Sequence, residues 1–221
     1  MDSLTQIALG AAVSEATVGK TIGRKATLWG AALRTFPDLD VFIAMGDPVA
    51  DFTYHRSFSH SFFVLTALTP LFAGALHKVH PGISKGVAHL AVFAIFVTHI
   101  LLDCFTVYGT QIFWPLSEHP VSIGSVFIID PAYTLPLLGG VMGSLIWRRM
   151  GAKANKIGIG ISTLYLAWSV SAQAIVRNQA LTDLAAADLP HGSVLVTPTP
   201  FNTLLWRIVA VDSEGYHVGY I

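Results

Sequence analysis

Histidine and aspartate residues gather in four short parts of an otherwise apolar chain. These parts are residues 37–40, 55–61 and 99–103, together with Asp130. Ionisable side chains beside membrane-grade apolar segments lose their hydration, which is costly, so they indicate a functional site by default. Carboxylate oxygens and imidazole nitrogens are ligands that zinc, manganese and iron accept. The pattern therefore predicts a divalent metal site, with zinc the expected ion and manganese or iron as alternatives.

Helical spacing indicates which of these side chains can share one ion. His99 and Asp103 are four residues apart, one turn of a helix, so they lie on the same face. His55 and His60 are five residues apart, about 140° around an ideal helix, and meet only if the stretch between them is a loop or a helix start. We expect five metal ligands: Asp40, His55, His60, His99 and Asp103.

Two more polar residues are expected to assist the reaction. Asp38 and Asp40 alternate along the chain, so one can coordinate while the other orients a ligand histidine. We assign Asp38 the role of general base, with Asp103 as the alternative, and Arg56 the role of binding an anionic group such as a phosphate. In the structural alternative, the aspartates form ion pairs with Arg34 or Arg56. For Asp130, which directly precedes a proline, the alternative role is that of a helix cap.

The composition is typical of a membrane protein. Of the 221 residues, 53% are hydrophobic and 12% are charged, against about 25% charged in an ordinary soluble domain. The net charge of zero gives no indication of a nucleic-acid partner. The single cysteine, Cys104, excludes an internal disulfide. The first residues lack the basic region of a cleavable signal peptide, so we expect this segment to be retained.

Apolar stretches predict a bundle of membrane-spanning helices. Residues 59–77, 86–105, 132–147 and 157–176 are each near the length that crosses hydrocarbon, with 132–147 marginal. Residues 4–18 form a helix that is too polar for a clear span, and 26–46 is an apolar stretch that Pro37 can kink or end.

Basic residues predict the orientation of these spans. They fall in three short segments: Arg24 and Lys25, Lys78 and Lys85, and Arg148, Arg149, Lys153 and Lys156. Placing all three segments in the cytoplasm follows the positive-inside rule. The four groups of ionisable residues then lie toward the outer, periplasmic face. This placement is independent of those groups, because the orientation was derived from the three basic segments alone.

After residue 177 the pattern changes to that of strands. Residues 193–197, 204–211 and 216–221 alternate apolar and polar side chains and are separated by turns such as 212–215. We therefore predict a mostly α protein, a polytopic transmembrane helical bundle with a short C-terminal β-rich segment outside the membrane. Its two parts are a membrane-embedded domain over 1–177 and an extramembrane segment over 178–221. The strand alternation of the second part is still under way at residue 221.

The ordered motifs resemble a known family, the YdjM-like (LexA-regulated) inner-membrane proteins. The matching pieces are Met1-Asp2-x-x-Thr5 with Gly10, Pro37-Asp38-Leu39-Asp40, His55-Arg56-x-x-x-His60-Ser61, His99-x-x-Leu102-Asp103-x-x-Thr106-x-Tyr108-Gly109-Thr110 and Trp114-Pro115. The resemblance covers roughly residues 1–177. It implies a multi-span bacterial inner-membrane protein with a divalent-metal hydrolase site. Gln6 departs from the family pattern, which has a histidine there.

These observations lead to one main hypothesis and two alternatives. The main hypothesis is a metal-dependent hydrolase that acts on a lipid-like or phosphoester substrate near the periplasmic face, with membrane lipid as its surroundings. The first alternative is a non-enzymatic metal or proton transporter, or a scaffold. A transporter typically holds its polar groups near the bilayer midplane on broken helices. The second alternative is a structural polar network without metal. The oligomeric state stays open.

Overall fold

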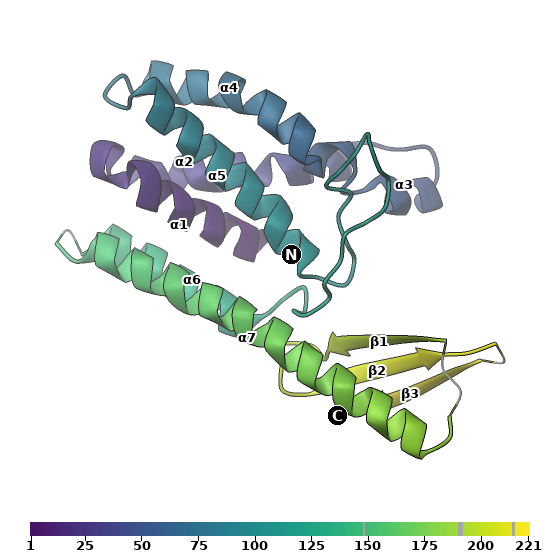
Figure 1. Ribbon diagram of the computed structural model, residues 1–221. Helices are drawn as coiled ribbons and strands as arrows, with labels where there is room; N and C mark the ends of the chain where they lie inside the picture. Colours follow the sequence, from purple (N-terminus) through teal and green to yellow (C-terminus); the bar gives the residue numbers. More distant parts are fainter. Residues whose placement is uncertain (148, 190–191, 214) are drawn as a thin grey trace.

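The computed structural model describes residues 1–147, 149–189, 192–213 and 215–221. Its helices and strands follow one another along the chain (Figure 1) as α1 (Ser3–Ile22), α2 (Lys25–Thr35), η1 (Pro37–Phe42), α3 (Pro48–Tyr54), η2 (Phe58–His60), α4 (Phe62–Val79), α5 (Lys85–Cys104), α6 (Pro131–Ile146), α7 (Gly151–Ala186), β1 (Ser193–Pro198), β2 (Trp206–Val211) and β3 (Tyr216–Tyr220). Here η1 and η2 are short 3₁₀-helices. The mostly helical class and the C-terminal β-rich segment are confirmed.

Three of the described helices are long and apolar enough to cross a membrane, namely α4, α5 and α7. Two of these helices begin at a serine that precedes an apolar stretch. Ser61 caps the first turn of α4, and Ser84 caps that of α5. The remaining expected span, residues 132–147, corresponds to α6, which is a shorter apolar helix of 16 residues. Asp130 caps its first turn by accepting from the Ala132 N–H.

Helix α7 is longer than the hydropathy pattern predicts. Its 36 residues give a length of about 54 Å, against about 30 Å of hydrocarbon in a bilayer. The division expected at residue 177 therefore falls inside a continuous helix. In the last ten residues of α7 polar side chains interrupt the apolar ones, which is why the sequence pattern ends the span ten residues earlier than the helix ends.

Helices α1 and α2 form a closely packed hairpin against α5 (Figure 1). The close approach depends on two glycines. A Cβ atom added at Gly10 would lie 2.4 Å from the Gly30 carbonyl oxygen, and one added at Gly30 would lie 2.0 Å from that of Gly10. The hairpin thereby holds the side chains of Gln6 and Arg34 inside the bundle, where both are buried.

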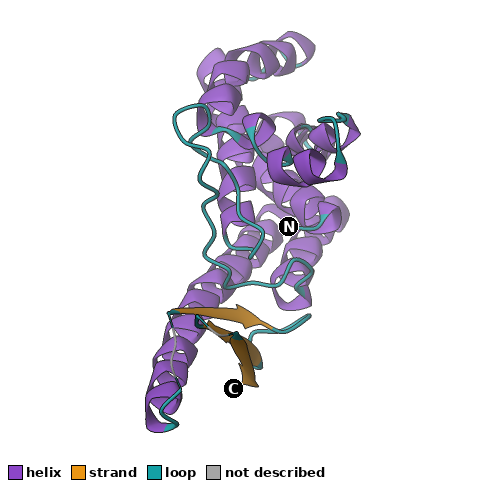
Figure 2. Ribbon diagram, turned by 90° about the vertical axis from the view of Figure 1, so that its right-hand side faces the viewer, coloured by secondary structure: helices purple, strands orange, loops and turns teal. Residues whose placement is uncertain are grey.

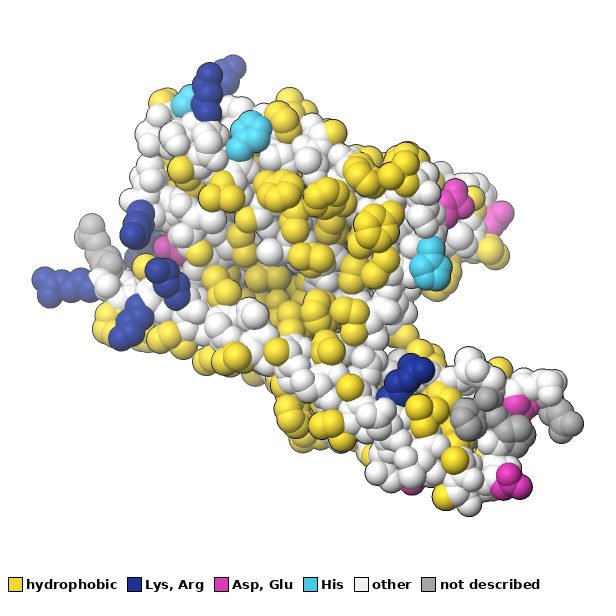
Figure 3. Space-filling model, in the orientation of Figure 1, with side chains coloured by type: hydrophobic (Ala, Val, Ile, Leu, Met, Phe, Trp, Pro, Cys, Tyr) yellow, Lys and Arg dark blue, Asp and Glu magenta, His cyan; other side chains and the backbone are white. Residues whose placement is uncertain are grey.

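The two ends of the bundle differ in charge. The α1–α2, α4–α5 and α6–α7 connections lie at one end (Figure 1), and most lysine and arginine side chains gather there (Figure 3). Acidic side chains lie mainly toward the opposite end, with a broad hydrophobic face between them (Figure 3). Arg148 of the third basic segment lies outside the described residues.

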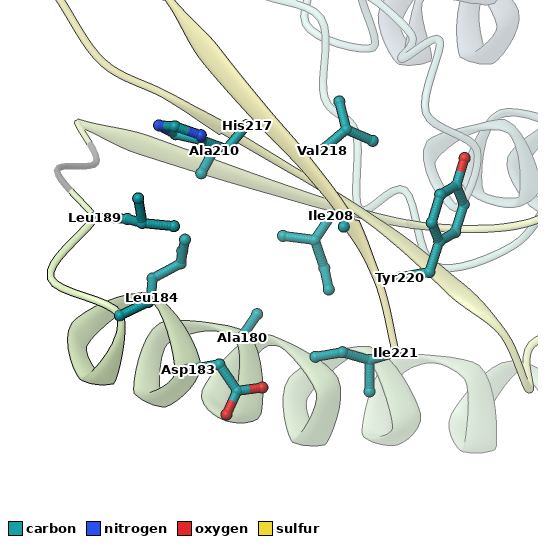
Figure 4. Close-up of a pocket in the computed structure, with 12 residues that line it drawn as sticks. Ala180, Asp183, Leu184, Leu189, Ile208, Ala210, His217, Val218, Tyr220 and Ile221 are labelled. Atoms are coloured by element: carbon teal, nitrogen blue, oxygen red, sulfur yellow. The ribbon is translucent and has the colours of Figure 1, made fainter.

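The C-terminal strands form an antiparallel sheet in the order β1-β2-β3. Val196, Trp206 and Ile208 pack it against Ala172 and Ala180 of α7, beside the long connection between α5 and α6 (Figure 2). A pocket of about 270 Å³ separates the end of α7 from β2 and β3, with Asp183, Ile208 and Tyr220 among its lining (Figure 4). Glu214, in the turn expected over 212–215, lies outside the described residues.

Candidate metal centre

Four ionisable side chains from three separate elements converge at one end of the bundle. They are Asp38 of η1, His60 of η2, and His99 and Asp103 of α5 with one ligand atom from each, all within 4.8 Å of one another. We call these four residues the quartet. His99 lies five residues before the end of α5, about 8 Å along the helix axis. The quartet therefore lies near one end of this candidate span and not at its middle.

The spacing of the quartet fits one metal ion. The Nε2 atoms of His60 and His99 are 3.1 Å apart, and the Asp103 Oδ2 atom lies 3.4 Å from the first and 3.3 Å from the second. The Asp38 Oδ1 atom lies 3.3 and 3.6 Å from the same nitrogens. Two donors on one tetrahedral zinc at about 2.1 Å lie about 3.4 Å apart. These five separations are close to those of ligands around a single ion.

Some polar atoms of the quartet also lack a hydrogen-bond partner among the described residues. Asp103 Oδ2 is buried and accepts no hydrogen bond from the described residues. Burying an unpaired carboxylate oxygen is costly. The side chains of His60, His99 and Asp103 are fully buried, whereas that of Asp38 is 21% exposed. Asp38 is therefore the edge of the quartet at which a small molecule can enter.

Ser59 and Asp40 orient the His60 ring. The Ser59 hydroxyl donates to Asp40 Oδ2 at 2.7 Å and lies 2.9 Å from His60 Nδ1. Because that hydroxyl proton is used on Asp40, the serine oxygen is free to accept from an Nδ1–H. This tautomer leaves the lone pair of His60 on Nε2, which faces the quartet.

Gln6 connects Asp103 to a buried arginine. Its amide nitrogen donates to Asp103 Oδ1 at 2.9 Å, and its amide oxygen accepts from Arg34 Nε at 2.7 Å. Arg34 also donates to the Thr98 carbonyl, so its guanidinium is fixed to α5. The amino group of Met1 is a further contact of Asp103 Oδ1. Oδ1 is thus fully engaged, and Oδ2 is left for the quartet.

The two aspartates of the 37–40 motif lie in places other than those expected from the sequence. Asp38, expected as a general base, belongs to the quartet, whereas Asp40, expected as a ligand, orients His60 and pairs with His55 Nδ1 at 3.1 Å. The reason is local: η1 is a 3₁₀-helix, in which residues two apart point about 120° away from each other.

His55 also lies outside the quartet, although it was expected among the ligands. Its ring centroid is 6.2 Å from that of His60, and its side chain is 30% exposed. The chain reverses between the two histidines because Arg56 has a φ of 63°, a left-handed conformation that is uncommon outside glycine. His55 lines two small pockets, of about 230 and 290 Å³, beside the quartet.

Arg56 reaches the quartet from that strained position. Its Nη1 atom lies 3.5 Å from Asp103 Oδ1, its guanidinium lies 5.3 Å from the centroid of the Tyr108 ring, and its backbone N–H donates to Asp40 Oδ2. Nε and Nη1 are buried without a hydrogen-bond acceptor among the described residues. A backbone strain of this kind is often kept at functional sites, and here it aims unused donors at the quartet.

The electrostatics favour ionised carboxylates in η1. Burial would raise the pKa of Asp40, but hydrogen bonds from His55, Ser59 and the Arg56 N–H outweigh it and lower the pKa to about 2. Burial opposes the shift of Asp38 as well, and its contacts with His60 and His99 hold that pKa far below the usual range. Both groups are anionic at neutral pH, as orientation of His60 and metal binding require.

Sequence reasoning missed two contributors to this site, Ser59 and Tyr108. The structure gives the role of helix cap to Ser61, and Tyr108 was seen only as part of a family motif. Gln6, which departs from that motif, is a hydrogen-bond donor to Asp103. An alternating Asp-x-Asp motif and a serine next to a ligand histidine are the signals that point to the orienting pair of Asp40 and Ser59.

The fold and the site together define a class, an apolar helical membrane protein with a group of aspartates and histidines that could hold a metal ion. The family profile described as YdjM inner membrane protein matches residues 1–176, and the chain belongs to this family. Among curated proteins, YfhP of Bacillus subtilis (strain 168) is 24% identical over 234 residues, which cover 99% of this chain and 68% of YfhP. No solved structure matches the chain.

Proposed function

We propose that the protein is a metal-dependent hydrolase of the inner membrane, with one divalent ion, zinc in the first instance, held by the quartet. The observation that carries this proposal is the convergence of the four ligand atoms within 4.8 Å of one another, with the two histidine nitrogens 3.1 to 3.6 Å from each other and from both carboxylates, close to the spacing of donors around a single ion. An ion bound there would act as a Lewis acid and lower the pKa of a water at an open position. The remaining chemistry comes from side chains of the chain itself.

His55 is the group best placed to accept a proton. Its Nδ1 atom is 3.1 Å from Asp40 Oδ1, and a carboxylate on one ring nitrogen fixes the tautomer and leaves the other nitrogen as a base. The side chain is partly exposed and faces the pockets beside the quartet. His55 thus takes the general-base role that sequence reasoning gave to Asp38.

Arg56 is placed to bind the anionic part of a substrate. A guanidinium with free donors matches the oxygens of a phosphate, and Nε and Nη1 of Arg56 have no acceptor among the described residues. With the quartet near a span end, on the side opposite the basic connections, a phosphoester presented at the periplasmic face of the membrane is the substrate that we propose. A transporter would place its ligands closer to the midplane.

The test is hydrolysis by purified, reconstituted protein of a panel of phosphomonoesters and phospholipids, with and without a chelator. We expect metal-dependent release of phosphate from at least one substrate. His99→Ala should lose metal and turnover, whereas His55→Gln should keep the metal and lose turnover. His119→Gln, a change at an exposed histidine outside the site, is the control. Full activity of His55→Gln would refute the role of His55, and metal-independent turnover would refute the proposal.

A further inference from the structure

A large cavity lies between the α5–α6 connection and the C-terminal sheet. It has a volume of about 750 Å³. Val107, Val126, Phe127 and Ile128 line it from the α5–α6 connection, and residues 197–200 and Tyr220 line it from the end of β1, the loop that follows it and β3. We call it the sheet-side cavity. Its apolar wall offers few partners to water, so an apolar group is its fitting occupant.

The sheet-side cavity begins next to the quartet. Thr106, which lines it, donates to the backbone carbonyl of Asp103. Phe52 and Tyr108 line both this cavity and the smaller pocket that contains His55 and Arg56. The Tyr108 hydroxyl donates to the Phe52 carbonyl, so the two rings stand together between the apolar cavity and the polar pocket.

Charge indicates the kind of head group. Among the described residues, Arg207 is the one charged residue in the lining of the sheet-side cavity, and none of them brings a carboxylate to it. Arg56 lies in the adjoining pocket, which Glu118 also lines. Nε and Nη1 of Arg56 have no hydrogen-bond acceptor among the described residues. A molecule that extends from the cavity to Arg56 is therefore apolar along its length and anionic at its end.

A lipid can reach this cavity from the bilayer. The segment 41–52 leads from η1 to α3 and exposes large apolar side chains, with Phe42 at 83%, Val49 at 74% and Phe52 at 67%. Phe52 is at once part of this exposed segment and part of the cavity wall. Apolar side chains so exposed at a span end are suited to the membrane interface.

We propose that the sheet-side cavity binds the hydrocarbon chain of a phosphorylated lipid, whose phosphate lies against Arg56. The inference rests on the proposed function for the reaction at the quartet, but the binding it describes requires no turnover. It gives the C-terminal sheet a role as one wall of the lipid site, and it makes the α5–α6 connection the determinant of chain binding.

The test uses nanodiscs of phosphatidylcholine that contain phosphatidic acid with a photoreactive diazirine in its acyl chain. The protein carries His60→Ala, so that the lipid is not consumed. We expect cross-links on the peptides that contain Val107 and Ile128. Dodecyl phosphate should compete for these cross-links, whereas glycerol phosphate, with a phosphate but no chain, should not.

A matched pair of variants separates this site from lipid around the bundle. Ile128→Trp fills the cavity and should abolish the cross-links. Ile129→Trp changes a neighbour of similar exposure, 47% against 41%, that is not part of the lining, and should leave them intact. Cross-links confined to α4, α5 and α7, or equal cross-linking of the two variants, would overturn the inference. Cross-linking as expected, with no hydrolysis by wild type, would refute the proposed function alone.

Discussion

The Nε2 atoms of His60 and His99 face each other at 3.1 Å, although 39 residues separate them in the chain. Two imidazole nitrogens at this distance need either a shared proton or a cation between them. Asp38 and Asp103 add carboxylate oxygens at 3.3 to 3.6 Å from both. Two neutral rings and two carboxylates around one point would balance the charge of a divalent ion.

Asp38 and Asp40 should differ in their effect on metal affinity. Asp38→Asn removes a ligand charge and should abolish binding. Asp40→Asn removes only the orientation of His60, and loss of such a supporting group typically weakens metal affinity about 10- to 100-fold. The measurement is titration with zinc by isothermal calorimetry. Asp183→Asn, on the exposed end of α7, is the control, and equal losses for both variants would contradict the assignment.

Gln6→Ala should destabilise the protein by about 1–3 kcal/mol, because it leaves the buried Nε–H of Arg34 without its acceptor and removes one of the hydrogen bonds to Asp103 Oδ1. Gln179→Ala removes an amide from an exposed pair with Asp183 and should have little effect. Thermal unfolding in one detergent measures both. If the two variants unfold at the same temperature, Gln6 does not connect these charges.

Gly10→Ala should disrupt the α1–α2 hairpin, because its Cβ atom would lie 2.4 Å from the Gly30 carbonyl oxygen. Overpacking of this kind typically costs about 1–3 kcal/mol. Gly74→Ala, in α4, meets nothing within 4 Å and serves as the control. Unfolding temperature reports the cost, and zinc affinity reports whether displacement of Gln6 reaches Asp103. A Gly10→Ala protein as stable as the control would show that the hairpin is not packed this closely.

Much of the fold could be predicted from the sequence. The apolar runs identify α4 and α5 to within a few residues, since hydrocarbon imposes both length and composition on a span. The alternation after residue 193 likewise predicts β1, β2 and β3. The end of α7 could not be predicted, because outside the membrane a helix needs only one apolar side, and there the sheet covers it.

The candidate site was predictable as a set of residues but not as a set of roles. His99 and Asp103 follow from helical spacing alone. The 3₁₀ conformation of η1 decides whether Asp38 or Asp40 faces the histidines. No periodicity in the sequence predicts that conformation. The turn that removes His55 from the quartet requires a positive φ at Arg56, and an arginine gives no signal for that conformation.

The central claim is that the quartet binds one divalent ion, and elemental analysis of the purified protein tests it most directly. Wild-type protein, purified without chelator and exchanged into metal-free buffer, should retain one equivalent of a divalent metal per chain. His60→Ala and His99→Ala, shown to be folded by circular dichroism, should retain none. A folded wild-type protein that neither carries metal nor takes up added zinc would contradict the account and leave the quartet as a structural polar network.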